Sequence, residues 1–248
     1  MSKAMRALFQ LILISSTIWF CATCDAQQLK LYCEDDRPLQ FFDANGSLTG
    51  LTVEIVLEIE KRLGLHDKIM VVPWARGLDK LDHDANTVLF TMARTSERES
   101  LYQWVGPIAE VEYGLYAKAD SPIQIRSLEE AKQVESIGVY RNDIRDQTLS
   151  RLGFKNLDRA SSNISSFKKL MIGRVSLYAD SKMGVSALAR ASGFQVEDVK
   201  QVFPLFKSGL YIAISKKTDP QRALQWNAAL NQMRKDQTLQ RLQKKFLP

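Results

Sequence analysis

The segment FTMARTSERESLYQWVGP, residues 90–107, decides how the rest of the chain is interpreted. Phe90 ends an apolar run that is typical of a buried strand. Thr91 then lies where this strand leaves the sheet, and Thr95 or Ser96 is placed to cap a following helix. Because ligands of open α/β sheets bind at the carboxyl ends of strands, binding side chains are expected in this segment.

Two arginines, Arg94 and Arg98, lie four residues apart in the segment. Arg98 is expected in the first turns of the helix, close to Thr91. A guanidinium can hold a carboxylate by a bidentate charge-assisted pair, and a hydroxyl beside it can donate a further hydrogen bond. The alternative is that both arginines are solvated helix charges, since charged side chains at i and i+4 are common.

The segment resembles two motifs of the family 3 extracellular solute-binding proteins. Thr91 to Arg98 is similar to the T-x-x-R motif, and Trp104 to Pro107 is similar to the F-S-x-P-Y motif that follows it. The likeness extends over most of the chain after residue 28. These proteins are periplasmic receptors of polar amino-acid ABC transporters, and their arginine grips the α-carboxylate of the ligand. The resemblance therefore assigns that role to Arg98.

The resemblance implies an α/β fold of the type II periplasmic-binding-protein class, with two lobes that close by a hinge motion. Residues 27–112 and 207–248 would form lobe 1, and residues 113–206 would form lobe 2. The first crossover strand is expected at residues 111–117, which alternate in polarity. The second is expected at residues 202–207.

Residues 1–26 have the pattern of a cleaved secretory signal peptide. Lys3 and Arg6 give it a positive start, a short apolar region follows, and Ala26 offers a small residue for cleavage. An uncleaved membrane anchor is the alternative. Export would place the protein in the periplasm with Cys33 as its remaining cysteine, which forms no internal disulfide and is expected to be a buried structural thiol.

The composition is that of an ordinary globular protein. Of the 248 residues, 45% are hydrophobic, which is sufficient for a core in each of two modest lobes. The formal net charge is +6, but acidic and basic residues are mixed along the chain. This mixing argues against a dedicated nucleic-acid surface. We expect a monomer that binds no nucleic acid.

Two further candidates for lobe 1 follow a strand expected at residues 68–73. Trp74 could be either core packing or an aromatic wall over the ligand, and Arg76 is a weaker candidate contact. The run at residues 82–84, Asp-His-Asp, could suggest a metal, but no partner ligands lie nearby in the sequence. A solvated loop is expected there, so neither a metal nor a cofactor is predicted.

The candidates from lobe 2 lie after two expected strands. Asn142 or Asp143 could cap a helix whose free N–H groups and dipole would suit an anion. The family has small residues at this point, and they touch the ligand. Residues 173–180 resemble the family's G-r-x-D-a-x-x-x-D motif, whose last aspartate binds the α-amino group of the ligand. The resemblance gives that role to Asp180, and a plain loop or cap role is the alternative.

Motifs of catalysis are scarce. His66 and His83 lie in no metal-ligand pattern, and the sequence has no nucleophile elbow, P-loop or dinucleotide fingerprint. The resemblance favours a binding protein over an enzyme: it would capture a small carboxylate-bearing solute, an amino acid or related compound, for the membrane permease of an ABC transporter. The alternatives are a dehydratase-like enzyme on the same scaffold, and a sensing module for a membrane partner.

Overall fold

The computed structural model of the protein describes residues 28–247, so the predicted signal peptide lies outside the described residues. Helices and strands alternate along most of this length. In chain order the elements are β1 (Lys30–Cys33), β2 (Phe41–Phe42), β3 (Leu48–Thr49), α2 (Leu51–Leu63), β4 (Ile69–Val71), α3 (Trp74–His83), β5 (Thr87–Ala93), β6 (Tyr102–Lys118), α4 (Leu128–Gln133), β7 (Ile137–Tyr140), α5 (Ile144–Arg151), β8 (Leu157–Ala160), α6 (Asn163–Met171), β9 (Leu177–Ser181), α7 (Lys182–Ala191), the 3-10 helix η1 (Val196–Asp198), β10 (Val199–Ser215), α8 (Pro220–Lys235) and α9 (Thr238–Phe246).

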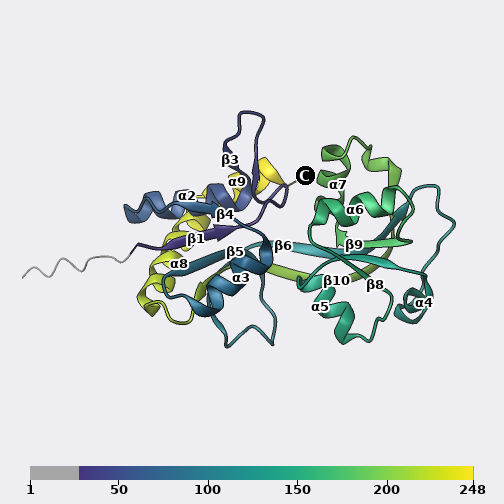
Figure 1. Cartoon of the computed structure of the whole chain (residues 1–248). Coiled ribbons are helices and arrows are strands. Elements are labelled where there is room, and N and C mark those ends of the chain that lie inside the picture. The colour runs from purple at the N-terminus through teal and green to yellow at the C-terminus, as the bar shows by residue number, and fades with distance from the viewer. Residues whose placement is uncertain (1–27, 248) are drawn as a thin grey trace, which may run out of the picture.

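Two long strands, β6 and β10, run through the middle of the molecule. Each is 17 residues long, and they pair antiparallel from Tyr102 opposite Ser215 to Lys118 opposite Val199. The eight-stranded sheet has the order β4-β1-β5-β10-β6-β9-β7-β8. The two long strands therefore join one parallel group, β4-β1-β5, to a second parallel group, β9-β7-β8 (Figure 1).

The remaining elements gather into two lobes on either side of the long strands (Figure 1). Helices α2, α3, α8 and α9 belong to one lobe, and α4 to α7 belong to the other. The expected two-lobed α/β fold is thus confirmed, and its crossovers are continuous strands. The predicted lobe boundaries, after residues 112 and 206, lie inside β6 and β10 and stay predictions.

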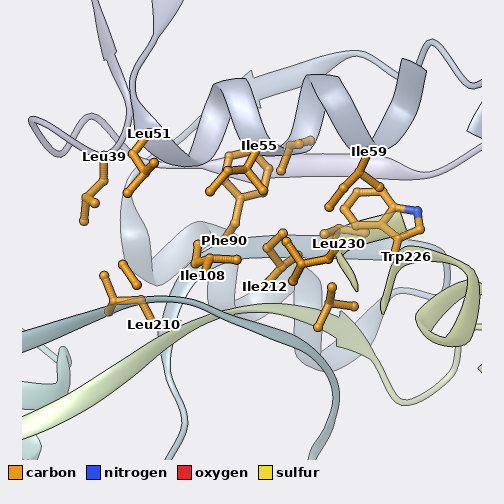
Figure 2. Packing of buried hydrophobic residues seen from close by; sticks show 14 of the residues in the cluster. Leu39, Leu51, Ile55, Ile59, Phe90, Ile108, Leu210, Ile212, Trp226 and Leu230 are labelled. Atoms are coloured by element: carbon orange, nitrogen blue, oxygen red, sulfur yellow. The ribbon is translucent and has the colours of Figure 1, made fainter. Parts of the chain in front are cut away.

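The main core of the first lobe packs α2 against the sheet and α8. Ile55 and Ile59 on α2 point toward Phe90 of β5 and Trp226 of α8, and all four side chains have no exposed surface (Figure 2). Burying side chains of this size stabilises the fold by roughly 1.5–3 kcal/mol each. Helix α2 ends as expected at Gly64, whose φ of 67° is a left-handed conformation that glycine adopts without steric cost.

The helix predicted after Thr95 is wrong. Residues 96–101 form turns, in which the N–H of Arg98 donates to the carbonyl of Thr95 and that of Leu101 donates to the carbonyl of Arg98. The reason is the length of the connection. Strand β5 ends at residue 93 and β6 begins at residue 102, so the chain must reverse within a few residues.

Cys33 is a buried structural thiol, as expected. Its side chain has no exposed surface, and it forms no disulfide. Burial, assisted by the nearby carboxylates of Glu34 and Asp35, raises the pKa of the thiol to about 12. Because the thiolate is the reactive form, this cysteine is inert at neutral pH.

Neither a membrane span nor a metal cluster is found in the part of the chain that the structure describes. None of its helices combines the length and the apolar character that crossing a bilayer requires. Across residues 28–247, no three His, Cys, Asp or Glu side chains gather in a way that could hold a metal ion.

Candidate functional site

The two lobes face each other across a cleft at the carboxyl ends of their parallel strands. It encloses about 570 Å³ of empty space, part of it open to solvent. The strands that lead into it are β1, β5, β7 and β9, which is where an open α/β sheet places its ligands. The charged side chains that line its walls are Glu34, Asp36, Arg98, Asp143, Arg145 and Asp180, with Arg37 exposed at the mouth.

Arg98 lies buried in the wall of the first lobe, with 6% of its surface exposed. Its Nη1 donates to the carbonyl of Ala93 at 3.1 Å and its Nη2 donates to Oε1 of Gln147 at 2.9 Å. The guanidinium lies 6.0 Å from the ring centroid of Trp74. Among residues 28–247, Arg98 makes no ion pair. Burial lowers the pKa of Arg98, yet a guanidinium stays protonated in proteins, so the cleft wall carries a positive charge that no described carboxylate pairs with directly.

Thr91 lines the cleft at the end of β5, close to Arg98 in the chain. The side chain is half-buried, and its hydroxyl donates to Oε1 of Gln40 at 2.9 Å. A hydroxyl oxygen can also accept hydrogen bonds, so Thr91 can accept one from a bound solute without losing Gln40.

In the second lobe, the start of α5 is capped by its own side chain. The carboxylate of Asp143 accepts from the N–H groups of Arg145 at 2.8 Å and Asp146 at 3.2 Å. These are the N–H groups that the sequence suggested for an anion. The predicted cap by Asp143 is therefore confirmed, whereas the predicted anion site at free N–H groups is wrong, because the carboxylate of Asp143 occupies them.

Arg145 extends from α5 into the cleft and is 5% exposed. Its Nε donates to Asp143 at 2.5 Å, its Nη1 pairs with Asp180 at 2.6 Å, and its Nη2 donates to Oδ1 of Asn163 at 2.8 Å. Burial alone would lower the pKa of Arg145, but Asp143 and Asp180 outweigh it and hold the pKa well above its ordinary value. The guanidinium thus joins three elements of the second lobe.

Asp180 has both carboxylate oxygens satisfied by the chain. Oδ1 accepts from the N–H of Ser181 at 2.6 Å and from Arg145, and Oδ2 accepts from the hydroxyl of Tyr178 at 2.5 Å. The side chain is almost fully buried. Asp180 does line the cleft, as the resemblance suggested, but Arg145 already supplies the positive charge at its carboxylate that a ligand ammonium would otherwise supply.

Glu34 and Asp36 form a pair of acids at the end of β1 that the sequence analysis missed. Both are half-buried and line the cleft. Oδ1 of Asp36 accepts from Nδ2 of Asn163 at 3.2 Å, and Glu34 accepts from the hydroxyl of Tyr140. Their position directly after the first buried strand was a usable signal, because the carboxyl end of a parallel strand faces the ligand.

Burial raises the pKa of both acids. For Asp36 it acts together with the neighbouring Asp180 and raises the pKa to about 7, against the opposing effect of Arg145. For Glu34, burial and then the charge of Asp36 raise the pKa well above its ordinary value. Neither carboxyl makes an ion pair with another described residue, so both can receive a positive charge from a solute.

Two of the predicted contacts lie outside the cleft. Arg94 is exposed, pairs with Glu99, and places its guanidinium 5.2 Å from the ring centroid of Tyr211. Arg76 is exposed on α3 and is not part of the cleft wall. Thr91 and Ala93 of β5 line the cleft, and successive side chains of a strand point to opposite faces, so Arg94, directly after β5, follows the other face. Arg98 reaches the cleft from the turns at residues 96–101. For Arg94 the surface alternative was correct.

Trp74 and Asn142 meet across the cleft. The indole Nε1 of Trp74 donates to the carbonyl of Asn142 at 3.3 Å, and that carbonyl also accepts from Nε2 of Gln147 at 3.2 Å. The side chain of Asn142 is exposed, so only its backbone faces the other lobe. Trp74 packs in a buried cluster with Tyr32 and Leu81 and also lines the cleft, which combines both expected roles.

Further contacts hold the lobes together at the rim. Arg98 of the first lobe bonds Gln147 of the second, and Glu97 pairs with Arg151. On the other side of the cleft, Asp36 of the first lobe accepts a hydrogen bond from Asn163 of the second. The structure therefore represents a closed arrangement of the two lobes.

Comparison with known proteins places these features in context. A family model described as bacterial extracellular solute-binding proteins, family 3, matches residues 30–248. The probable amino-acid-binding protein YxeM of Bacillus subtilis (strain 168) is 24% identical over 215 residues, which cover 83% of this chain and 78% of YxeM.

Solved structures with the same fold include a histidine kinase sensor domain with similarity to periplasmic binding proteins. It has a TM-score of 0.82 and 18% identity, over 89% of this chain and 96% of that one. An ancestral arginine-binding protein bound to arginine has a TM-score of 0.79 and 22% identity, over 89% of this chain and 98% of that one. At these identities the likeness shows the shared fold.

Proposed function

The chain belongs to the bacterial extracellular solute-binding proteins of family 3, and on that basis we propose that it captures a small carboxylate-bearing solute. The solute is an amino acid or a related compound, held in the cleft between the lobes. After export and cleavage of the signal peptide at Ala26, the protein works in the periplasm as a monomer. It delivers the solute unchanged to the membrane permease of an ABC transporter.

The buried guanidinium of Arg98 is the observation that carries this proposal. Taking a charge out of water costs several kcal/mol unless a partner compensates it. Here the partners are a carbonyl and an amide oxygen, which are neutral. A solute carboxylate can take the place of Gln147 and form a bidentate pair with Arg98, while Thr91 and Trp74 bound the same wall.

Closure of the lobes explains how binding is made selective. The rim contacts of Trp74 and Glu97 with the second lobe form only when the lobes meet. A solute that touches both walls binds the closed state better and shifts the population toward it. Closure also excludes water, which strengthens the pairing of the carboxylate with Arg98.

A thermal-shift experiment tests the proposal. The purified protein is screened against amino acids, small carboxylates and polyamines. A solute at about 100 times its Kd should stabilise the protein by roughly 2.7 kcal/mol, or about 5–10 °C in Tm. Arg98→Ala should abolish this shift. The matched control is Arg94→Ala, which removes an exposed arginine four residues away and should leave the shift intact.

Two results would contradict the proposal. A shift that persists in Arg98→Ala would show that the anchor is elsewhere. A solute that is chemically altered on incubation, as seen by mass spectrometry, would favour the dehydratase-like alternative over a binding protein.

A further inference from the structure

The charges of the cleft fall into one closed group and one open group. In the closed group, Arg145 lies between Asp143 and Asp180 and bonds both. In the open group, Arg98, Glu34 and Asp36 line the cleft without ion-pair partners among the described residues. A bound solute can therefore compensate charges only in the open group.

In the closed group, the guanidinium of Arg145 takes the place at Asp180 of a cation that a solute would otherwise supply. Asp180 accepts from Arg145 and Ser181 at Oδ1 and from Tyr178 at Oδ2, so the cation that compensates its carboxylate already comes from the chain. For a solute ammonium to replace this cation, Arg145 would have to leave a pocket in which it is 5% exposed and makes charge-assisted bonds on three sides. Hydrogen bonds of charged groups are among the stronger ones in proteins, so this displacement is unfavourable.

The open group is suited to a solute that carries both a carboxylate and a cation. A carboxylate on Arg98 compensates that guanidinium and leaves Glu34 and Asp36 in the cleft wall without a partner cation. Arg37 does not pair with these acids: it is exposed, stacks 4.2 Å over the ring of Phe41, and makes no ion pair with another described residue. A solute cation between the two acids would compensate them.

We propose, as a refinement that rests on the proposed function, that the cleft selects ω-amino or ω-guanidino carboxylates. The carboxylate binds Arg98, and the terminal cation binds between Glu34 and Asp36. Arg145 supplies the positive charge at Asp180, so an α-ammonium on the solute is not needed.

Binding at this pair should release a proton near neutral pH. Burial raises the pKa of Asp36 to about 7, Asp180 and Asp143 add to the rise, Arg145 opposes it, and Glu34 faces the same carboxyl. A solute cation needs the ionised form, so affinity should increase as pH rises through about 7, by up to about tenfold per unit. Titration calorimetry in two buffers of different ionisation enthalpy measures the release, which Asp36→Asn should reduce and Glu34→Gln with Asp36→Asn should abolish. Proton uptake on binding would overturn the proposed role of Asp36.

Calorimetry with matched solutes tests the selectivity itself. One set is lysine, ε-aminocaproate and norleucine; the other is arginine, δ-guanidinovalerate and norvaline. The second member of each set lacks the α-ammonium, and the third lacks the terminal cation. Loss of the α-ammonium should change Kd by no more than about threefold, whereas loss of the terminal cation should weaken binding by about 10- to 100-fold.

Variants in which the two acids are replaced by neutral amides test where the terminal cation of the solute binds. Glu34→Gln with Asp36→Asn should remove the preference for ε-aminocaproate over caproate. The matched control is Asp35→Asn, because Asp35 lies between these residues but is exposed and outside the cleft wall. Arg145→Ala provides the opposite test: it frees Asp180, so lysine should gain affinity relative to ε-aminocaproate.

The outcomes separate the refinement from the proposed function. If lysine or arginine binds more than about 100-fold tighter than its analogue without the α-ammonium, the refinement is wrong while carboxylate capture stands. If none of the six solutes binds but another carboxylate gives a shift that depends on Arg98, the refinement is again wrong. If no carboxylate depends on Arg98, the proposed function itself fails.

Discussion

Replacing Arg145 with Met should destabilise the protein by about 3–5 kcal/mol at pH 7. The variant keeps the volume of the side chain but removes the charge between Asp143 and Asp180, which are both nearly fully buried. Two buried carboxylates then face each other without a cation, and Asn163 loses the donor to its Oδ1. Urea denaturation at pH 7 gives the free energy of unfolding directly.

The loss should shrink in acid. Burial already raises the pKa of Asp143, and Arg145 is the largest effect that opposes the rise. Without Arg145, the folded variant therefore binds more protons than its unfolded chain near neutral pH. Its stability relative to the natural protein must then increase as pH falls from about 7 to about 5.

The matched control for this experiment is Arg151→Met in the same helix. Arg151 pairs with Glu97, and more than half of each side chain is exposed, so its loss should cost less than about 1 kcal/mol. Equal losses for the two variants, or a loss at Arg145 that does not depend on pH, would show that the buried network contributes little to folding.

Replacing Gly50 with Ala should cost about 3 kcal/mol or more. Gly50 has a φ of 122°, a conformation that residues with a side chain rarely adopt. An added Cβ would lie 2.5 Å from the carbonyl oxygen and 2.6 Å from the carbonyl carbon of Leu39, both backbone atoms that cannot rotate away. The same segment is tied to α2 by the bond from the N–H of Thr52 to the carbonyl of Leu39 at 2.8 Å.

Gly46→Ala separates the two causes of this cost. Gly46 also has a positive φ, 78°, but an added Cβ would meet no atom within 4 Å. The variant Gly46→Ala should lose about 1 kcal/mol of the free energy of unfolding, from the strained backbone conformation alone. The difference between the variants in urea denaturation measures the close approach of the chain at Leu39. Because Leu39 lines the cleft, Gly50→Ala should also reduce the thermal shift that the solute produces. Equal losses of stability in Gly50→Ala and Gly46→Ala would show that the close contact between Gly50 and Leu39 is not required.

Local order was predictable because it depends on neighbours in the chain. The glycine that ends α2 at Gly64, the serine cap of α4 at Ser127 and the proline that opens α8 at Pro220 all act within one helical turn. The alternation of β6 was visible for the same reason, although the full length of the strand was not. The resemblance then supplied the arrangement of these elements in two lobes, and it singled out Arg98.

Partners in the cleft were not predictable, because they are far apart in the chain. The amino-acid order contains Asp143, Arg145, Asn163 and Asp180, but the bonds that join them exist only where α5, α6 and β9 converge. Whether Asp180 is free or already satisfied cannot follow from its own surroundings in the chain. The same holds for Glu34 and Asp36, whose loop faces the other lobe only after β1 is placed in the sheet.

Arg94 and Arg98 show most clearly which features follow from the sequence and which depend on the tertiary structure. The sequence predicted that an arginine follows the carboxyl end of a buried strand, and that the chain has the elements of a two-lobed α/β fold. Spacing alone did not separate Arg94 from Arg98, and only the resemblance favoured Arg98. Folding separated them, because one lies on the outer surface beside Glu99 and the other is 6% exposed under the second lobe. Burial without an acidic partner is the basis on which we propose that Arg98 binds a carboxylate, and burial is a property of what packs over a residue.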